Sequence, residues 1–111
     1  MNSFSSPPSC CSSVTDVTQK LAALSHPARL EILKCLAGGR SCCCKEVVEH
    51  LDLAQSTVSQ HLKILVEAGL VRYAPERQRS RYEIDQAALR AVSVSVTALV
   101  DTFCAAGGAH I

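Results

Sequence analysis

The chain has 111 residues, of which 48% are hydrophobic and 19% are charged, and its formal net charge is +1. This length fits one small domain, and the near-neutral charge means that any surface for nucleic acid must be local. No apolar run approaches the ~20 residues that span a bilayer, and the N-terminus lacks the basic and apolar segments of a signal peptide. We therefore expect a cytoplasmic protein with no membrane partner.

The seven cysteines are unusual for such a protein. Thiols in the cytoplasm are kept reduced, and adjacent cysteines bridge each other poorly, so we do not expect a disulfide framework. Soft-ion binding and redox sensing remain as functions. A thiol enzyme would need a Cys-x-x-Cys motif or a nucleophile in a phosphate-binding loop. No two cysteines stand three apart, so we do not expect an enzyme.

The chain begins with a segment rich in Ser and Pro, residues 1–13, which predicts a flexible arm carrying Cys10 and Cys11. Apolar residues at steps of three and four then predict a first helix over 15–24.

A second helix is expected over 28–37, because Pro27 suits a first helical position and two glycines follow the segment. We expect His26 to cap this helix, Arg29 to form a structural salt bridge, and Cys35 to be a small core residue.

The segment 45–71 predicts a helix-turn-helix. A third helix capped by Ser41 should run to Leu51, and a fourth should cover 55–68 after a tight turn at 52–53. Hydroxyl and amide side chains on the N-terminal face of the fourth helix can read base edges. The expected DNA contacts are Gln55, Ser56, Thr57, Ser59 and Gln60 at bases, and His61 and Lys63 at phosphates.

A basic hairpin should follow, since residues 71–73 and 81–84 alternate like strands and 75–79 can form the tip. Its arginines would supply the positive charge that binds the DNA backbone. A soluble metal-buffering protein with no DNA role, which is an alternative function, would leave these arginines unexplained. They are Arg72, Arg77, Arg79 and Arg81.

The last helix should begin near Gln86, with Asp85 as its N-cap. Its apolar seam is longer than one small domain can cover, which indicates a partner subunit. The expected dimer interface comprises Val17, Leu21, Leu89, Val92, Val96, Leu99 and Phe103. Residues 105–111 should fray, which leaves 14–104 as the DNA-binding and dimerisation domain.

Three adjacent cysteines, Cys42, Cys43 and Cys44, stand at the start of the third helix. The helix dipole and the unpaired amides there favour thiolates, and Arg40 and Lys45 add positive charge. Since a helix turns successive residues ~100° apart, three in a row cannot all face the core. We expect these thiols to bind a soft ligand.

The segments ALSHPARLEIL (23–33) and LDLAQSTVSQHLKILVEAGLV (51–71), with the basic hairpin and RYEI after them, resemble the ArsR/SmtB family of bacterial repressors. The resemblance covers roughly 15–103. It implies a mainly α fold with a small β-hairpin, a winged helix-turn-helix with two strands between the fourth and fifth of its helices. It also implies a homodimer formed through the first and last helices.

Two turn positions depart from the family, which usually has Gly where Asp52 stands and Ser where Ala54 stands. Asp tolerates the left-handed conformation, and loss of a Ser cap costs only ~1 kcal/mol, so the turn should survive. Family members repress genes by binding double-stranded palindromic operator DNA, with half-sites ~10 bp apart for such a dimer, and leave it when an inducer binds.

The resemblance to arsenical-resistance repressors implies As(III) or Sb(III) as inducer, with Cd(II) or Pb(II) as alternatives. The implied ligands are Cys10, Cys11 and one or more of Cys42, Cys43 and Cys44. Cys42 and Cys44 have the family's Cys-x-Cys spacing, but counting back from Leu51 puts that pair at Cys43 and Lys45. Zinc is disfavoured because the last helix lacks the family's His pattern.

A second alternative is a redox- or persulfide-responsive repressor. The TFCAAGG segment with Cys104 is similar to the family's persulfide sensors. Their second cysteine, however, would fall at Lys34 rather than at Cys35.

Overall fold

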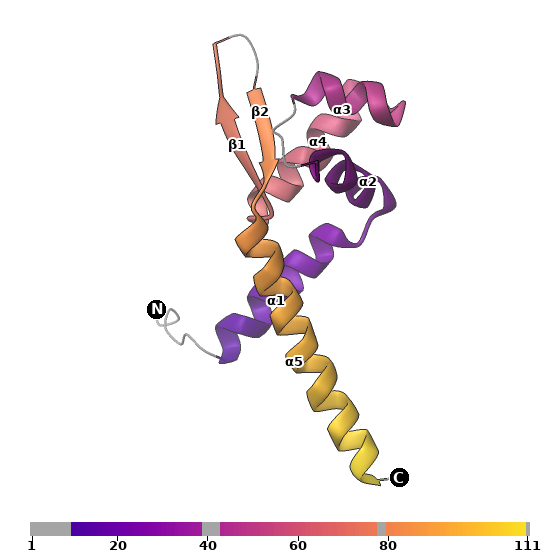
Figure 1. Cartoon of the computed structure of the whole chain (residues 1–111), viewed down its shortest axis with the longest axis vertical. Coiled ribbons are helices and arrows are strands. Elements are labelled where there is room, and N and C mark those ends of the chain that lie inside the picture. The colour runs from indigo at the N-terminus through magenta and orange to yellow at the C-terminus, as the bar shows by residue number, and fades with distance from the viewer. Residues whose placement is uncertain (1–9, 39–42, 78–79, 111) are drawn as a thin grey trace.

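The computed structural model describes the backbone of residues 10–38, 43–77 and 80–110, and the side chains of 14–38, 43–77 and 80–105. Two bundles of elements meet in it: a winged helix-turn-helix body and a pair of crossing helices, α1 and α5 (Figure 1). The elements are α1 (Cys10–Leu24), α2 (Pro27–Leu36), α3 (Cys44–Leu51), α4 (Gln55–Glu67), β1 (Val71–Pro75), β2 (Ser80–Ile84) and α5 (Gln86–His110).

The expected order of five helices and one hairpin is confirmed, but both end helices are longer than predicted. α1 begins at Cys10, so Cys10 and Cys11 belong to a helical turn and not to an arm. No Pro or Gly stands between Pro8 and Pro27 to stop that helix. α5 continues to His110, because its glycines near the end weaken a helix without breaking it.

The turn of the helix-turn-helix forms despite its departures from the family. Asp52 ends α3 in the left-handed conformation, with φ 56° and ψ 41°, and its N–H donates to the carbonyl of Val48. Ala54 precedes α4 in an extended conformation with no side-chain cap. α3 itself begins later than expected, with Cys43 as its N-cap; Ser41, predicted to cap it, lies outside the described residues.

The hairpin is antiparallel and pairs Val71 with Ile84 and Pro75 with Ser80. Its base is fixed to α5 by Asp85, whose N–H donates to the Leu70 carbonyl and whose Oδ1 accepts from Ala88 at 3.1 Å. The predicted N-cap is thereby confirmed.

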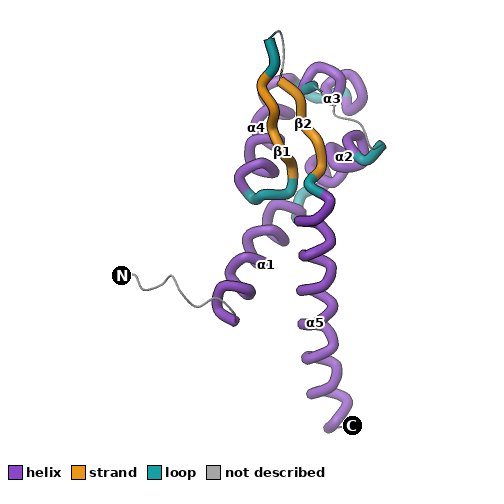
Figure 2. The backbone as a smooth tube through the Cα atoms, turned by 60° about the vertical axis from the view of Figure 1, so that its left-hand side comes forward, coloured by secondary structure: helices purple, strands orange, loops and turns teal. Residues whose placement is uncertain are grey.

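The core lies where α4 meets α2, α3 and β1 (Figure 2). Full burial of each such side chain stabilises the fold by about 1.5–3 kcal/mol. The largest fully buried side chains are Ile32, Leu36, Val47, Val58, Leu62, Leu65 and Leu70.

The helices α1 and α5 pack on each other and extend away from this body, which gives extents of 55 × 38 × 23 Å. Two residues predicted for a dimer interface, Val17 and Val92, are instead buried within the subunit, at 5% and 7% exposure. Apolar side chains left exposed on the two helices are Val14, Leu21, Val94, Val100 and Phe103.

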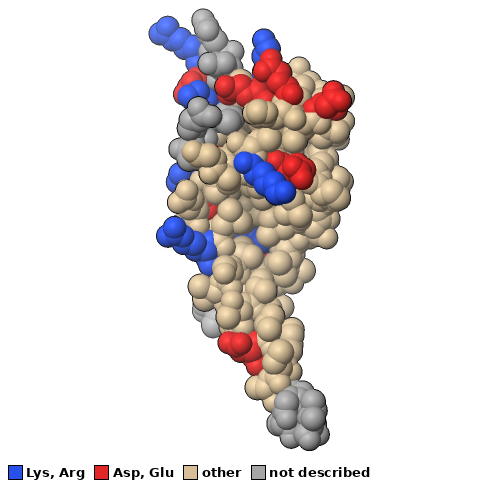
Figure 3. Space-filling view, turned by 45° about the vertical axis from the view of Figure 1, so that its right-hand side comes forward, with Lys and Arg blue, Asp and Glu red and all other residues tan. Residues whose placement is uncertain are grey.

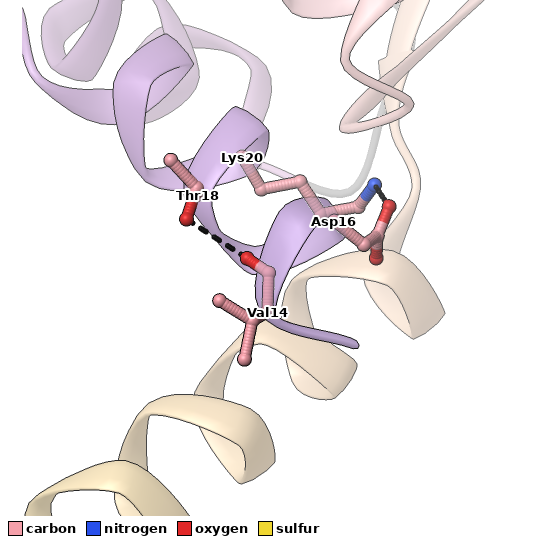
Figure 4. Close-up of polar contacts among 4 residues, drawn as sticks. All are labelled: Val14, Asp16, Thr18 and Lys20. Atoms are coloured by element: carbon pink, nitrogen blue, oxygen red, sulfur yellow. Dashed lines mark hydrogen bonds and ion pairs between the residues drawn. The ribbon is translucent and has the colours of Figure 1, made fainter. Parts of the chain in front are cut away.

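The exposed face of α1 is stiffened by local contacts near its start (Figure 4). Lys20 Nζ pairs with Asp16 Oδ1 at 2.9 Å, and Thr18 Oγ1 donates to the carbonyl of Val14 at 2.8 Å. Both contacts join residues four apart on α1, so they stabilise the helix itself.

The expectation that no apolar segment approaches the length needed to span a bilayer is wrong for α5. The window Gln86–Ala105 of α5 has a mean hydropathy of 1.4 and is long and apolar enough to cross a membrane by length and composition alone. On the face that Figure 3 shows, the lower projection that ends at the C-terminus carries few charged side chains, whereas the body above it carries many.

Candidate functional site

The helix α4 presents a polar face beside the hairpin. Val58, Leu62 and Leu65 point into the core, and Ser59, Gln60, Lys63 and Ile64 between them are exposed. Of the predicted DNA contacts, the exposed ones are Gln55, Ser56, Ser59, Gln60 and Lys63, while Thr57 is half-buried. Hydroxyl and amide groups at the N-terminal end of such a helix can reach base edges in the major groove.

The hairpin carries its arginines in weak ion pairs. Arg72 lies 3.6 Å from Glu83, and Arg81 lies 3.4 Å from Glu76. Exposed pairs of this kind contribute ~0–1 kcal/mol, so a phosphate group can displace the carboxylates. Arg77 is exposed, and Arg79 lies outside the described residues.

His61 does not lie on the polar face of α4. Its Nδ1 accepts a hydrogen bond from Arg29 Nε at 3.2 Å, and its ring centroid lies 4.5 Å from that of His26. Burial, followed by the charges of His26 and Arg29, lowers the pKa of His61. The side chain therefore faces α2 rather than the phosphates for which the sequence predicted it.

His26 and Arg29 are themselves placed largely as predicted. His26 is the N-cap of α2, and its Nδ1 accepts from the N–H of Ala28. Arg29 makes its structural bonds to His61 and to the carbonyls of Ala22 and Ala23, not to a carboxylate as the sequence suggested.

The cysteines at the start of α3 are more enclosed than the sequence predicted. Cys43 is buried, at 3% exposure, and its N–H donates to Glu46 Oε1 at 2.8 Å. Cys44 is half-buried, and burial, with a smaller contribution from Cys43, raises its pKa. The expected lowering by the helix terminus is therefore wrong for Cys44, since desolvation of the thiolate outweighs it.

The other predicted ligands are Cys10, Cys11 and Cys42. Cys42 and the side chains of Cys10 and Cys11 lie outside the described residues. Among the side chains that the structure does describe, no three of His, Cys, Asp and Glu are grouped to hold a metal ion.

A cleft of about 690 Å³ joins the thiols to both candidate DNA-reading elements. Cys43, Cys44 and Lys45 line it from α3, and Gln55 and Ser59 from α4. The hairpin closes it with Ser80 and Tyr82, which sequence reasoning missed. The alternation of β2 carries the missed signal, since it puts these two residues on one face and Arg81 on the other.

The two remaining cysteines lie far apart in the fold. Cys35 is half-buried on α2, and Cys104 is exposed near the far end of α5. Because α5 projects away from α2, one subunit does not bring these thiols together (Figures 1 and 2).

A three-helix body with a helix-turn-helix, a basic hairpin and an outward polar α4 face defines a winged helix-turn-helix DNA-binding regulator. Residues 26–73 match the family described as "Bacterial regulatory protein, arsR family". The arsenical resistance operon repressor of Staphylococcus xylosus is 36% identical to this chain, over 66% of the chain and 69% of that repressor. The chain belongs to the ArsR family, whose members are transcriptional regulators and not enzymes.

Two further comparisons extend the match along the chain. The biofilm growth-associated repressor of Agrobacterium fabrum is 38% identical, over 82% of this chain and 74% of that protein. The structure of an ArsR-like transcriptional regulator from Rhodococcus sp. RHA1 superposes with a TM-score of 0.77, covering 88% of this chain and 92% of that one at 22% identity. This last similarity confirms the fold over nearly the whole chain.

Proposed function

We propose that this protein is a homodimeric repressor that leaves a palindromic operator when trivalent arsenic or antimony binds its cysteine thiolates. The observation that carries the proposal is the shared cleft, in which Cys43 and Cys44 lie beside Gln55 and Ser59 of α4. A ligand held by the thiols would occupy space next to the residues that read DNA. The name of the Staphylococcus xylosus relative supports an arsenical inducer.

The donor atoms present fit such an inducer. Trivalent arsenic takes up to three thiolate sulfurs, and thiolates are the ligands that soft ions prefer. Cys43 and Cys44 line the cleft, and the proposal takes their sulfurs as two ligands and the third from Cys42, Cys10 or Cys11. Because Cys44 has a raised pKa, its ligation must release a proton at neutral pH.

The dimer is proposed from the exposed apolar residues of α1 and α5. Val14 and Val94 are 55% and 70% exposed and line one groove between these helices, while Phe103 is 64% exposed further along α5. A second subunit would cover them, which also accounts for the apolar composition of α5 in a protein that acts on DNA in the cytoplasm.

The proposed mechanism is strain between the paired subunits. Because the start of α1 lies away from α3 within one subunit (Figure 1), the link would join the start of α1 in one subunit to the start of α3 in its partner. Such a link would shift each helix-turn-helix relative to its twin. The two α4 helices would then no longer fit successive major grooves of one DNA face. A coupling free energy of about 1–3 kcal/mol is enough for ~5–150-fold weaker DNA binding.

The test is a fluorescence anisotropy titration of labelled promoter DNA with arsenite, antimonite, cadmium, lead and a persulfide donor. We expect arsenite or antimonite to weaken binding ~10-fold or more, and we expect the double variant Cys43→Ser, Cys44→Ser to retain DNA binding and lose that response. Cys35→Ser serves as the matched control, since Cys35 lies outside the cleft. Release by cadmium or lead alone would change the inducer, and release by the persulfide donor alone, lost in Cys104→Ser, would replace the proposal with redox sensing.

The part played by the start of α1 is tested separately. The double variant Cys10→Ser, Cys11→Ser should bind DNA normally and respond less to arsenite. An unchanged response would exclude a link between α1 and α3.

A further inference from the structure

The cleft contains an aromatic side chain from the hairpin that no DNA contact or thiol ligand accounts for. Tyr82 is half-buried and packs with Cys44 against the same hydrophobic core. Both line the cleft, one from β2 and the other from α3. Burial, with smaller contributions from Cys44 and Tyr73, raises the pKa of Tyr82, which is the electrostatic sign of a thiol nearby. A group bound to Cys44 would therefore share this cleft with the Tyr82 side chain.

Tyr82 is also tied firmly to the rest of the hairpin. It pairs directly with Tyr73 across the two strands, and the ring centroids lie 5.3 Å apart. Ser80 Oγ in turn donates a hydrogen bond to the Tyr73 hydroxyl at 2.9 Å. Cross-strand aromatic pairs stabilise a hairpin by ~0.2–1 kcal/mol, so displacement of the Tyr82 ring would disturb its contact with Tyr73 on β1. Arg72 and Arg81 adjoin these tyrosines in sequence and would move with the strands.

We propose that Tyr82 is a positioning residue that couples ligand binding at Cys44 to a movement of the hairpin. This hairpin, β1 and β2, is the basic wing of the fold. A ligand on the Cys44 sulfur displaces the Tyr82 ring, and the hairpin moves relative to α4 as one unit. The basic wing and α4 then no longer fit the same DNA site, within a single subunit. This inference rests on the proposed function, because it takes Cys44 as the place where the inducer binds. It does not depend on which inducer binds there.

The chemistry at the thiol needs no oxidant. Each cysteine that ligates arsenous acid forms one S–As bond, replaces one As–OH group and releases one water, with no change in oxidation state. Alkylation by iodoacetamide forms an S–C bond and releases iodide and a proton. Either reagent adds bulk at the Cys44 sulfur.

The composition of the chain provides a direct optical probe, because it contains no Trp and only two Tyr. In the Tyr73→Phe variant, all tyrosine emission comes from Tyr82. We expect this emission to change when arsenite or iodoacetamide is added, and not to change when Cys44→Ser is also present. The Tyr82→Phe variant, which reports Tyr73 alone, should respond less. An unchanged Tyr82 emission after mass spectrometry has shown a modified Cys44 would overturn the proposal.

The functional test separates positioning from folding. Tyr82→Leu keeps an apolar side chain in the cleft, and we expect it to bind operator DNA within about threefold of wild type. In wild type, arsenite should lower the affinity for operator DNA ~10-fold or more, and in Tyr82→Leu by less than about threefold. Ultraviolet absorption should show that arsenite still binds the thiols of the variant. Tyr73→Leu removes the ring that pairs with Tyr82 across the strands, so it should weaken the response less than Tyr82→Leu does, because Tyr82 itself stays beside Cys44.

Two failures are distinguishable. If wild-type protein keeps its DNA in arsenite, the proposed inducer is wrong, and alkylation of Cys44 still tests the role of Tyr82. If wild type releases DNA and Tyr82→Leu releases it equally, with thiol binding intact in both, the proposed role of Tyr82 is wrong.

Discussion

Arg29 on α2 donates a hydrogen bond from Nε to Nδ1 of His61 on α4, over 3.2 Å. The same guanidinium reaches the carbonyls of Ala22 and Ala23 at the end of α1, each at 3.2 Å. One side chain thus connects the proposed recognition helix to both helices behind it. These bonds orient α4 from its inner side, while its outer side stays available to DNA.

Replacing this arginine should destabilise the protein. Arg29→Ala removes the donor for two helix-terminal carbonyls and for His61, so we expect the free energy of unfolding to fall by ~1–3 kcal/mol. Urea unfolding followed by circular dichroism measures the change. Arg90→Ala on α5, where the arginine is exposed, is the matched control and should stay within ~0.5 kcal/mol of wild type. Equal stability of the two variants would show that the Arg29 network contributes nothing.

The stability of the protein should fall as pH falls below neutrality. Because the folded state lowers the pKa of His61, the unfolded chain binds the proton more tightly. The contribution of neutral His61 is therefore complete above ~6.5, the ordinary histidine pKa, and is lost as pH falls through the lower folded value. Urea midpoints measured between pH 7.5 and 5.5 should decrease.

A variant assigns this pH dependence to His61. His61→Gln keeps an acceptor for Arg29 and does not titrate, so its midpoint should vary less over the same range. His50→Gln replaces an exposed histidine and should retain the wild-type slope. A His61→Gln slope as steep as that of wild type would assign the effect elsewhere.

The sequence predicted those features that depend on neighbours along the chain. His26 caps α2, Asp85 caps α5, and Asp52 takes the left-handed conformation, since each position depends on local backbone chemistry. The polar face of α4 also followed from its periodicity.

Features that depend on packing between distant segments could not be predicted. His61 follows Gln60 on α4, and only the position of α2 decides that its ring faces inward. The pKa of Cys44 depends on how deeply β2 and α4 enclose it, which outweighs the local effect of the helix terminus. The place of Tyr82 in the cleft likewise arises only when the hairpin folds against α3.

An exposed arginine of the wing should set part of the salt dependence of DNA binding. Arg77 stands at the hairpin tip and is exposed, so we expect it to contact a phosphate. Removing one phosphate contact lowers the slope of log affinity against log salt concentration by ~0.9. Anisotropy titrations at salt concentrations between about 50 and 200 mM would measure this slope for Arg77→Ala, with Arg90→Ala as the control. Identical slopes for both variants would remove Arg77 from the interface.

The dimer should depend on the exposed end of α5. Phe103 is 64% exposed in the single subunit, and burying such a side chain contributes about 1.5–3 kcal/mol. In a two-fold symmetric dimer the same contact occurs twice, so Phe103→Asp should weaken association by ~3–6 kcal/mol. Sedimentation velocity should then show monomers at micromolar concentration, and affinity for a two-half-site operator should fall with it. Lys34→Asp introduces the same carboxylate on α2, outside the interface proposed for α1 and α5, and should leave the dimer intact. If Phe103→Asp also sediments as a dimer, the interface lies elsewhere on the molecule.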